Sequence, residues 1–281
     1  MTSLPPAKGF NWRNFGLRAA SAAVLASLSL WAVWVFDGRG LLWRAPFLVL
    51  VAVAGALLSI EWASMASPQA SRRASVVTTV AVVTTIFLAY AGYYEWAWLA
   101  VGAGAILAAT VVRGASVRAI DAAYGVLYIA PACLLIVWLR ETKQGQGWLL
   151  MLFATTWAAD IAAFVVGNAL KGPKLWPRFS PNKTWTGFFG GLIGAVAASV
   201  GVAAGFMHLS LAGAALIGLL GGLATMGGDL WESMLKRRFG VKDSGDLIPG
   251  HGGLLDRVDG MMVAVIVFAV ARLVVRFGWA H

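Results

Sequence analysis

Acidic, basic and glycine residues are concentrated in one short stretch near the C-terminus of this 281-residue chain. The stretch runs from Ser233 to Asp259 and lies between two long apolar runs. Of the twelve carboxylates in the chain, five fall between Glu232 and Asp259, and Asp229 stands just upstream. Packing in a membrane protein gives no reason to gather so many charges, because charged groups in apolar surroundings are costly. The stretch therefore predicts a site of chemistry.

One group of these residues falls at helical spacing. If the preceding apolar helix continues through this group, one face of the helix carries Asp229, Ser233, Lys236 and Arg237. An acid, a hydroxyl and two cations on one stripe can hold Mg²⁺ at one end and phosphate oxygens at the other. A basic anchor at the membrane surface is the alternative, and it accounts for Arg238. It does not account for Asp229, which we expect to bind a metal ion.

A glycine-rich loop follows the stripe and leads into the last apolar run. Gly252 and Gly253 permit positive φ angles and a close backbone approach to a ligand. Successive backbone N–H groups in such a loop can bind an anion. Asp256 is expected to ligate a metal ion together with Asp229 of the preceding helix. For Asp259, capping of the last helix and support of the site are equally open.

A second cluster of polar residues lies upstream. Asp160 falls inside an apolar run, where an acid is costly and indicates function. Lys183 and Thr184 come just before the next apolar run, and a helix N-terminus favours phosphate. We therefore expect this cluster to contribute to the same phosphate site.

The composition of the whole chain is that of a membrane protein. It is 60% hydrophobic and 12% charged, whereas soluble domains carry about 25% charged residues. Apolar stretches of about 20 residues can cross a bilayer as helices. Nine such stretches are present: 17–36, 43–62, 75–92, 95–112, 120–139, 148–167, 186–206, 209–231 and 258–277. We expect an all-α integral membrane protein with about nine transmembrane helices, the first of them uncleaved.

The net charge of +10 is explained by topology. With the N-terminus inside and nine spans, 16 of the 22 Lys and Arg residues lie on the inner side, as the positive-inside rule requires. The excess also favours contact with anionic membrane lipids. No motif supports nucleic-acid binding. The one cysteine, Cys133, has no partner for an internal disulfide, and we expect it to pack as a small hydrophobe.

The two halves of the chain differ. Residues 1–147 are spans with short loops and predict a lipid-facing scaffold. Residues 148–281 contain seven of the twelve carboxylates and both long polar loops, 168–185 and 232–257. The nine-span topology places both loops on the cytoplasmic side. We therefore expect the active site at the cytoplasmic side of the C-terminal half, in an inner or plasma membrane.

These motifs resemble a known family. The signature of CDP-diacylglycerol synthases (phosphatidate cytidylyltransferases) is similar to Ser233-x-x-Lys236-Arg237, Lys242-Asp243-x-Gly245 and Pro249-x-His251-Gly252-Gly253-x-x-Asp256-Arg257-x-Asp259. The family's upstream block resembles Asp160, Gly167 and Ser180-Pro181-x-Lys183-Thr184-x-x-Gly187. The resemblance covers about residues 150–275, and Thr186 and Asn168 depart from it.

The resemblance implies a membrane transferase of phospholipid biosynthesis, which converts CTP and phosphatidate into CDP-diacylglycerol and pyrophosphate. It also implies a homodimer. Mg²⁺ is the expected cofactor, with room for a second cation. The expected metal ligands are Asp229 and Asp256. The expected catalytic residues are Lys236, Arg237, Lys242, Asp243, Asp160 and His251, the last of these first of all a loop-shaping residue. The expected substrate-binding residues are Ser180, Lys183, Thr184, Ser233, Gly252, Gly253 and Arg257.

Two other functions remain as alternatives. A CTP-dependent lipid-alcohol kinase, such as a polyprenol kinase, would also use a metal ion, basic loops and a membrane site. A transporter would use acids within the membrane as ion or proton relays. Transporters often have paired halves with interrupted helices, whereas the polar residues here gather in one half.

Overall fold

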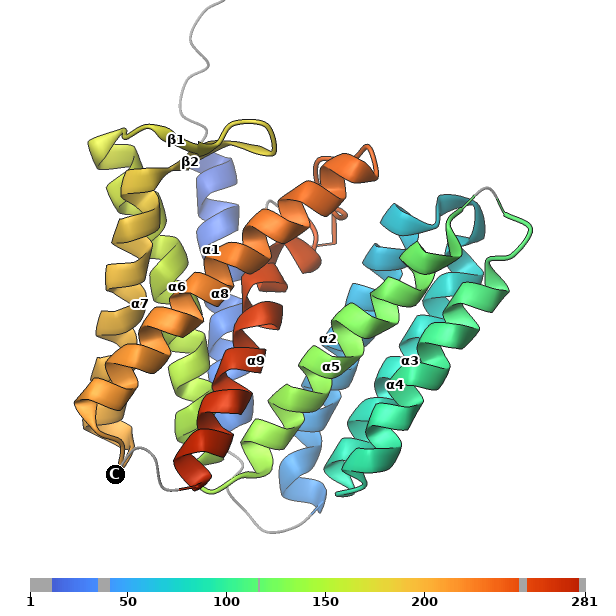
Figure 1. The fold of residues 1–281 in the computed structure, drawn as a ribbon, viewed down its shortest axis with the longest axis horizontal. Helices are drawn as coiled ribbons and strands as arrows, with labels where there is room; N and C mark the ends of the chain where they lie inside the picture. The colour runs from blue at the N-terminus through green and yellow to red at the C-terminus, as the bar shows by residue number, and fades with distance from the viewer. Residues whose placement is uncertain (1–11, 35–40, 116, 248–251, 278–281) are drawn as a thin grey trace, which may run out of the picture.

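The computed structural model describes residues 12–34, 41–115, 117–247 and 252–277 (Figure 1). Within these ranges the chain forms nine helices, one short 3-10 turn and one β-hairpin. The helices are α1 (Trp12–Trp34), α2 (Leu41–Ala66), α3 (Ser71–Tyr90), α4 (Tyr94–Val111), α5 (Ala119–Glu141), α6 (Gly145–Leu170), α7 (Trp185–Phe206), α8 (Leu211–Arg238) and α9 (Leu255–Arg276). The 3-10 turn spans Pro68–Ala70, and the strands are β1 (Lys174–Trp176) and β2 (Ser180–Thr184).

The predicted fold class is confirmed. Among the described residues, the helices from α2 to α9 are long and apolar enough to cross a membrane. The apolar part of α1 that the structure describes, Ala20–Trp34, is shorter. Many large apolar side chains, such as Phe164 and Ile193, lie on the outer surface of these helices, as expected of surfaces that face lipid. The chain is therefore an all-α integral membrane protein with several spans.

The helices form two groups that meet at α5 and α9. In Figure 1, α2, α3, α4 and α5 lie on one side, and α6 and α7 lie on the other, with α8 and α9 between them. Helix α9 packs against both α8 and α5, and it also touches α2. Helix α8 is strongly tilted relative to its neighbours (Figure 1). The last two helices therefore connect the two halves of the chain.

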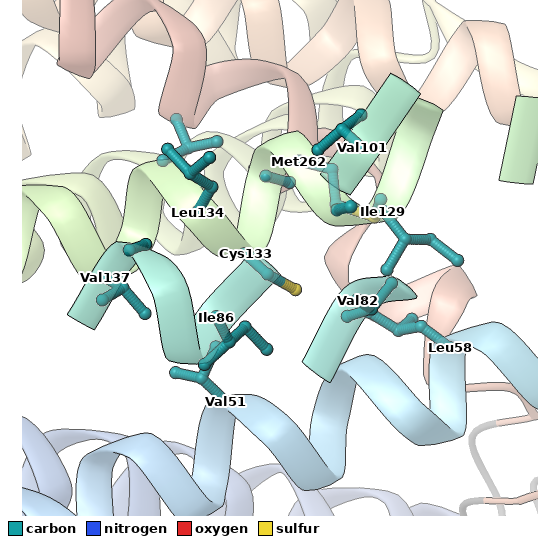
Figure 2. Packing of buried hydrophobic residues seen from close by; sticks show 14 of the residues in the cluster. Val51, Leu58, Val82, Ile86, Val101, Ile129, Cys133, Leu134, Val137 and Met262 are labelled. Atoms are coloured by element: carbon teal, nitrogen blue, oxygen red, sulfur yellow. The ribbon is translucent and has the colours of Figure 1, made fainter. Parts of the chain in front are cut away.

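A continuous apolar core holds α2 to α5 together and reaches α9 (Figure 2). Cys133 is buried in this core without a disulfide, as predicted. The side chains labelled in Figure 2 come from five helices: Val51, Leu58, Val82, Ile86, Val101, Ile129, Cys133, Leu134, Val137 and Met262. Because the core contains atoms of both halves, it fixes the position of α9.

The long polar connection before α7 is a β-hairpin, and the one after α8 is a loop. The two strands, β1 and β2, pair antiparallel between α6 and α7; this hairpin was not predicted. Figure 1 places this hairpin at the same end of the bundle as the C-terminal end of α8. The two long polar loops therefore share one end of the bundle, as predicted.

Packing between α3 and α4 yields a first prediction. A Cβ atom on Gly104 would lie 2.4 Å from the Cβ of Ala81, whereas a Cβ on Gly102, in the same helix, meets nothing within 4 Å. We expect Gly104→Leu to lower the free energy of unfolding by about 1–3 kcal/mol through overpacking. The matched control, Gly102→Leu, should change it by less than about 0.5 kcal/mol. Thermal unfolding in detergent measures both, and equal destabilisation would contradict this packing of α3 on α4.

Candidate active site

Helix α8 continues without a break to Arg238, so the predicted stripe exists. Asp229 is about one-third exposed, and Arg237 lies on the surface. Ser233 and Lys236 are partly buried. The helix ends where Gly240 adopts a positive φ of 76°, which reverses the chain into the glycine-rich loop.

Lys236 joins α8 to α9. Its ammonium donates to Glu232 Oε2 at 2.8 Å and to Asp256 Oδ1 at 2.5 Å. The side chain of Glu232 is fully buried, and a buried carboxylate needs such a partner to offset its lost hydration. Glu232 had no predicted role, although its i,i+4 spacing from Lys236 was a signal for this pair.

Asp256 closes the loop between α8 and α9. Its Oδ2 accepts hydrogen bonds from the backbone N–H and the hydroxyl of Ser244, both at 3.0 Å, and from the N–H of Gly253 at 3.1 Å. Gly252 has the positive φ that was predicted, 82°. A Cβ on Gly253 would lie 1.9 Å from Ser244 Oγ. The close approach that these glycines permit is therefore made to the chain itself.

Glu61 of α2 completes this arrangement from the first half of the chain. Its two oxygens accept from the N–H groups of Leu254 and Leu255 at 2.8 and 2.7 Å. N–H groups at the start of a helix have no acceptor within the helix itself, and the positive end of the helix dipole favours a carboxylate there. The residue is 4% exposed. An acid inside an apolar run is a functional signal, and that signal at Glu61 was missed.

The capping alternative for Asp259 is wrong. Helix α9 begins at Leu255, four residues earlier, so Asp259 lies inside the helix. Its Oδ1 accepts from the N–H of Gly260 at 2.6 Å, and its carboxyl is a close neighbour of Glu232. Asp259 and Glu232 therefore form a buried acidic pair between α8 and α9.

The hairpin brings the upstream cluster to α8. Lys183, on β2, forms an ion pair with Asp229. Asp160 of α6 lies within electrostatic range of both residues and of Arg257. Thr184 caps α7, because its hydroxyl accepts from the N–H of Gly187 at 3.1 Å. The structure thus brings together predicted residues from α6, the hairpin, α8 and α9.

Thr186, one of the two departures from the family pattern, stabilises the hairpin. Its hydroxyl accepts from the N–H of Gly172 at 3.2 Å and is hydrogen-bonded to the Thr184 hydroxyl at 3.1 Å. A Cβ on Gly172 would lie 2.5 Å from the Thr186 methyl. The threonine therefore serves the local structure at this position.

The remaining predicted residues lie around this cluster. Lys242 and Asp243 are exposed on the loop after α8, and Arg237 Nη1 donates to the carbonyl of Val241 at 3.5 Å. Ser180 is partly buried at the start of β2. His251 lies outside the described residues. Substrate contacts of these side chains stay a prediction.

One further contact fixes α8 to the first half, and a second holds its partner helix α5 against α2. Arg238 donates to Asp121 Oδ1 of α5 at 2.5 Å, so it is more than the surface anchor that was expected. The indole N–H of Trp62, on α2, donates to the backbone carbonyl of Asp121 at 2.9 Å. The first half of the chain therefore positions the polar end of α8 as well as the start of α9.

The metal site of Asp229 and Asp256 stays a prediction, which the donor atoms present here can be tested against. Within the described ranges, no group of three or more His, Cys, Asp or Glu side chains is arranged to hold a metal. Mg²⁺ at phosphate sites commonly uses one or two carboxylates and completes its shell with phosphates and water. Asp229 and Asp256 each present one oxygen to a lysine ammonium, so a metal ion would have to take the place of that ammonium. This donor set fits Mg²⁺ only together with a phosphate ligand.

Comparison with known proteins identifies the family. The profile described as "Cytidylyltransferase family" matches residues 17–275. The chain belongs to the cytidylyltransferase family. A Brucella suis biovar 1 protein named phosphatidate cytidylyltransferase is 35% identical over 268 residues, 89% of this chain and 90% of the relative. A Pseudomonas aeruginosa protein of the same name is 33% identical over 285 residues, 93% and 97% of the two chains. The family match thus includes Glu61 and most of the first half.

Glu61 supplies the second prediction. Glu61→Ala leaves two N–H groups at the start of α9 without their acceptor, which costs about 1–3 kcal/mol for a buried donor. Amide hydrogen exchange at residues 252–256 should therefore become faster. Glu95→Ala, which removes an exposed acid near the opposite end of the bundle, is the control and should leave that exchange unchanged. Wild-type exchange rates in Glu61→Ala would contradict the assigned cap.

Proposed function

We infer that the chain transfers CMP from CTP to phosphatidate, giving CDP-diacylglycerol and pyrophosphate. One observation carries the inference: ion pairs and hydrogen bonds gather the lysines and acids of the family signature at one end of the bundle. The relatives that match most of the chain are named phosphatidate cytidylyltransferase. Such an arrangement suits transfer between a lipid phosphate and a nucleotide.

In the proposed reaction, a phosphatidate oxygen attacks the α-phosphorus of CTP and the bond to pyrophosphate breaks. Catalysis of this kind consists mostly of positioning and charge neutralisation. The exposed Arg237 and Lys242 would neutralise the triphosphate and the departing pyrophosphate. Lys236 is paired with two carboxylates and would supply its charge to the nucleotide phosphates once substrate binds. Ser180, Lys183 and Arg257 would hold phosphate oxygens, and Asp160 and Asp243 would orient these cations.

Asp229 and Asp256 are the proposed holders of Mg²⁺. When bound, the ion would neutralise the charge that develops on the nucleotide phosphates. The ammonium groups of Lys183 and Lys236 would then move from these acids to substrate phosphates. Binding of the substrate would therefore exchange one set of charge pairs for another within the same cluster.

We further propose that this end of the bundle faces the cytoplasm, in the bacterial inner or plasma membrane. The cationic side chains of the hairpin and the loop after α8 favour that side by the positive-inside rule. CTP, phosphatidate and membrane lipids are the proposed partners. The homodimer rests on the family resemblance alone, and native mass spectrometry of the solubilised protein tests it.

The reaction gives the third prediction. Purified protein with phosphatidate, labelled CTP and Mg²⁺ should release pyrophosphate and form lipid-linked CMP in equal amounts, and chelation should stop both. Asp229→Asn should lower the turnover by at least about a hundredfold, since a metal contributes several kcal/mol. Asp246→Asn, which changes an exposed acid of the same loop, is the matched control and should remain active.

Each other outcome of this assay has a distinct meaning. Release of CDP together with a phosphorylated lipid alcohol would replace the proposal with the kinase. Substrate flux across vesicles without CTP consumption would replace it with the transporter. Near-normal turnover in Asp229→Asn would leave the reaction in place and overturn the metal assignment.

The orientation gives the fourth prediction. Cys133 is buried, so an introduced surface cysteine is the preferred target of a membrane-impermeant maleimide. Lys174→Cys lies on the hairpin, and Tyr93→Cys lies at the α3–α4 turn at the other end of the bundle (Figure 1). In intact spheroplasts Tyr93→Cys should be labelled, whereas Lys174→Cys should require permeabilisation. The reverse pattern would overturn the cytoplasmic placement.

A further inference from the structure

A cavity of about 340 Å³ lies between α5, α8 and α9, within the membrane-spanning part of the chain. This volume falls within the range of small-molecule sites, about 300–1,000 Å³. The lining is mainly apolar and includes Leu127 and Tyr128 of α5, Gly227 and Trp231 of α8, and Met262 and Ile266 of α9. Leu127 and Ile266 are about half exposed, at 49% and 48%. The cavity is therefore lined in part by residues of the lipid-facing surface.

The same cavity borders the polar end of α8, where Asp229 and Glu232 lie. Gly227 and Gly228 line it, and the next residue along α8 is Asp229. Tyr128 lies within electrostatic range of Asp229, Glu232 and Asp259. An amphiphilic ligand can therefore place a charged group at the cluster and an apolar part in the cavity.

One polar group in the lining has no partner. Among the described residues, the hydroxyl of Tyr128 is buried and makes no hydrogen bond. The neighbouring hydroxyl of Tyr124, in contrast, accepts from the indole N–H of Trp231 at 2.8 Å. A buried hydroxyl without a partner is costly, and Tyr and Trp usually find one when buried. The Tyr128 hydroxyl can therefore donate a hydrogen bond to an acceptor atom on a largely apolar ligand.

We propose that this cavity binds the glycerol backbone and the upper part of one acyl chain of phosphatidate, with the Tyr128 hydroxyl donating to an ester carbonyl oxygen. The proposal rests on the proposed function and adds the lipid-binding site to it. The phosphate of the lipid lies at the lysine and acid cluster, and the chain leaves toward the bilayer past Leu127 and Ile266. An ester carbonyl is the acceptor that a diacyl lipid carries at the junction of these two parts.

The first test narrows the cavity. A Cβ on Gly227 meets nothing within 4 Å, so Gly227→Leu adds its side chain to the cavity without a clash at that atom. Gly201→Leu in α7, which also meets nothing within 4 Å, is the matched control. We compare kcat/KM for dioleoyl and dihexanoyl phosphatidate at saturating CTP. Gly227→Leu should shift the ratio against the long chains by about tenfold, the effect of one or two methylenes in an apolar pocket, and Gly201→Leu should not.

The second test removes the proposed hydrogen bond. Tyr128→Phe keeps the ring and deletes the hydroxyl. With diacyl phosphatidate it should raise KM by about fivefold, the value of one neutral hydrogen bond. With the dialkyl ether analogue, which has no ester carbonyl, KM should stay at the wild-type value for that lipid. The ether analogue thus separates this contact from any general effect of the substitution on packing.

The outcomes separate the lipid site from the reaction itself. Equal effects of Gly227→Leu on long and short chains, or of Tyr128→Phe on ester and ether lipids, would overturn the proposal and leave the cavity to bulk bilayer lipid or to a second copy of the chain. Wild-type protein that forms no lipid-linked CMP would overturn the proposed function. Because the first result requires an active enzyme and the second an inactive one, the two failures are distinguishable.

Discussion

Two carboxylates accept hydrogen bonds from backbone N–H groups at the start of α9 and in the loop that precedes it. Glu61 takes the donors of Leu254 and Leu255, and Asp256 takes those of Ser244 and Gly253. Buried donors of this kind are costly without acceptors, so both acids stabilise the packing of the loop after α8 against α9. Lys236 then binds the second acid from α8. The geometry of the whole polar end follows from this arrangement of charges.

Several parts of this site follow from local rules that a sequence displays directly. A helix places residues at i, i+4, i+7 and i+8 on one face, so the stripe from Asp229 to Arg237 was predictable once α8 was known to continue. Gly252 stands in a polar loop, and its positive φ agrees with the ordinary use of glycine. The long apolar runs predicted most helix ends to within four residues, because a bilayer requires that length, but α8 continues seven residues beyond its apolar run.

Other parts depend on contacts between distant segments, which no local pattern contains. Glu61 meets its partners across more than 190 residues, and Asp121 meets Arg238 across 117. The first half of the chain was expected to be scaffold, yet it supplies both of these acids. The division into a scaffold and a catalytic half stays a prediction, but these contacts show that the second half is positioned by the first. The hairpin was missed because its short strands carry no apolar alternation.

The packing of α6 against α7 has a consequence for the order of assembly. A Cβ on Gly190 or Gly194 would lie within about 2.6 Å of Val166 or Ala162, and the hairpin hydrogen bonds close the connection between the two helices. All of these contacts are near in sequence, and local contacts form early in folding. We therefore expect this pair of helices to dock during synthesis once both have left the ribosome, before α8 and α9 are complete. We expect Lys183 to be in place before its partner Asp229 is made, so that the polar end is completed by the last two helices to arrive.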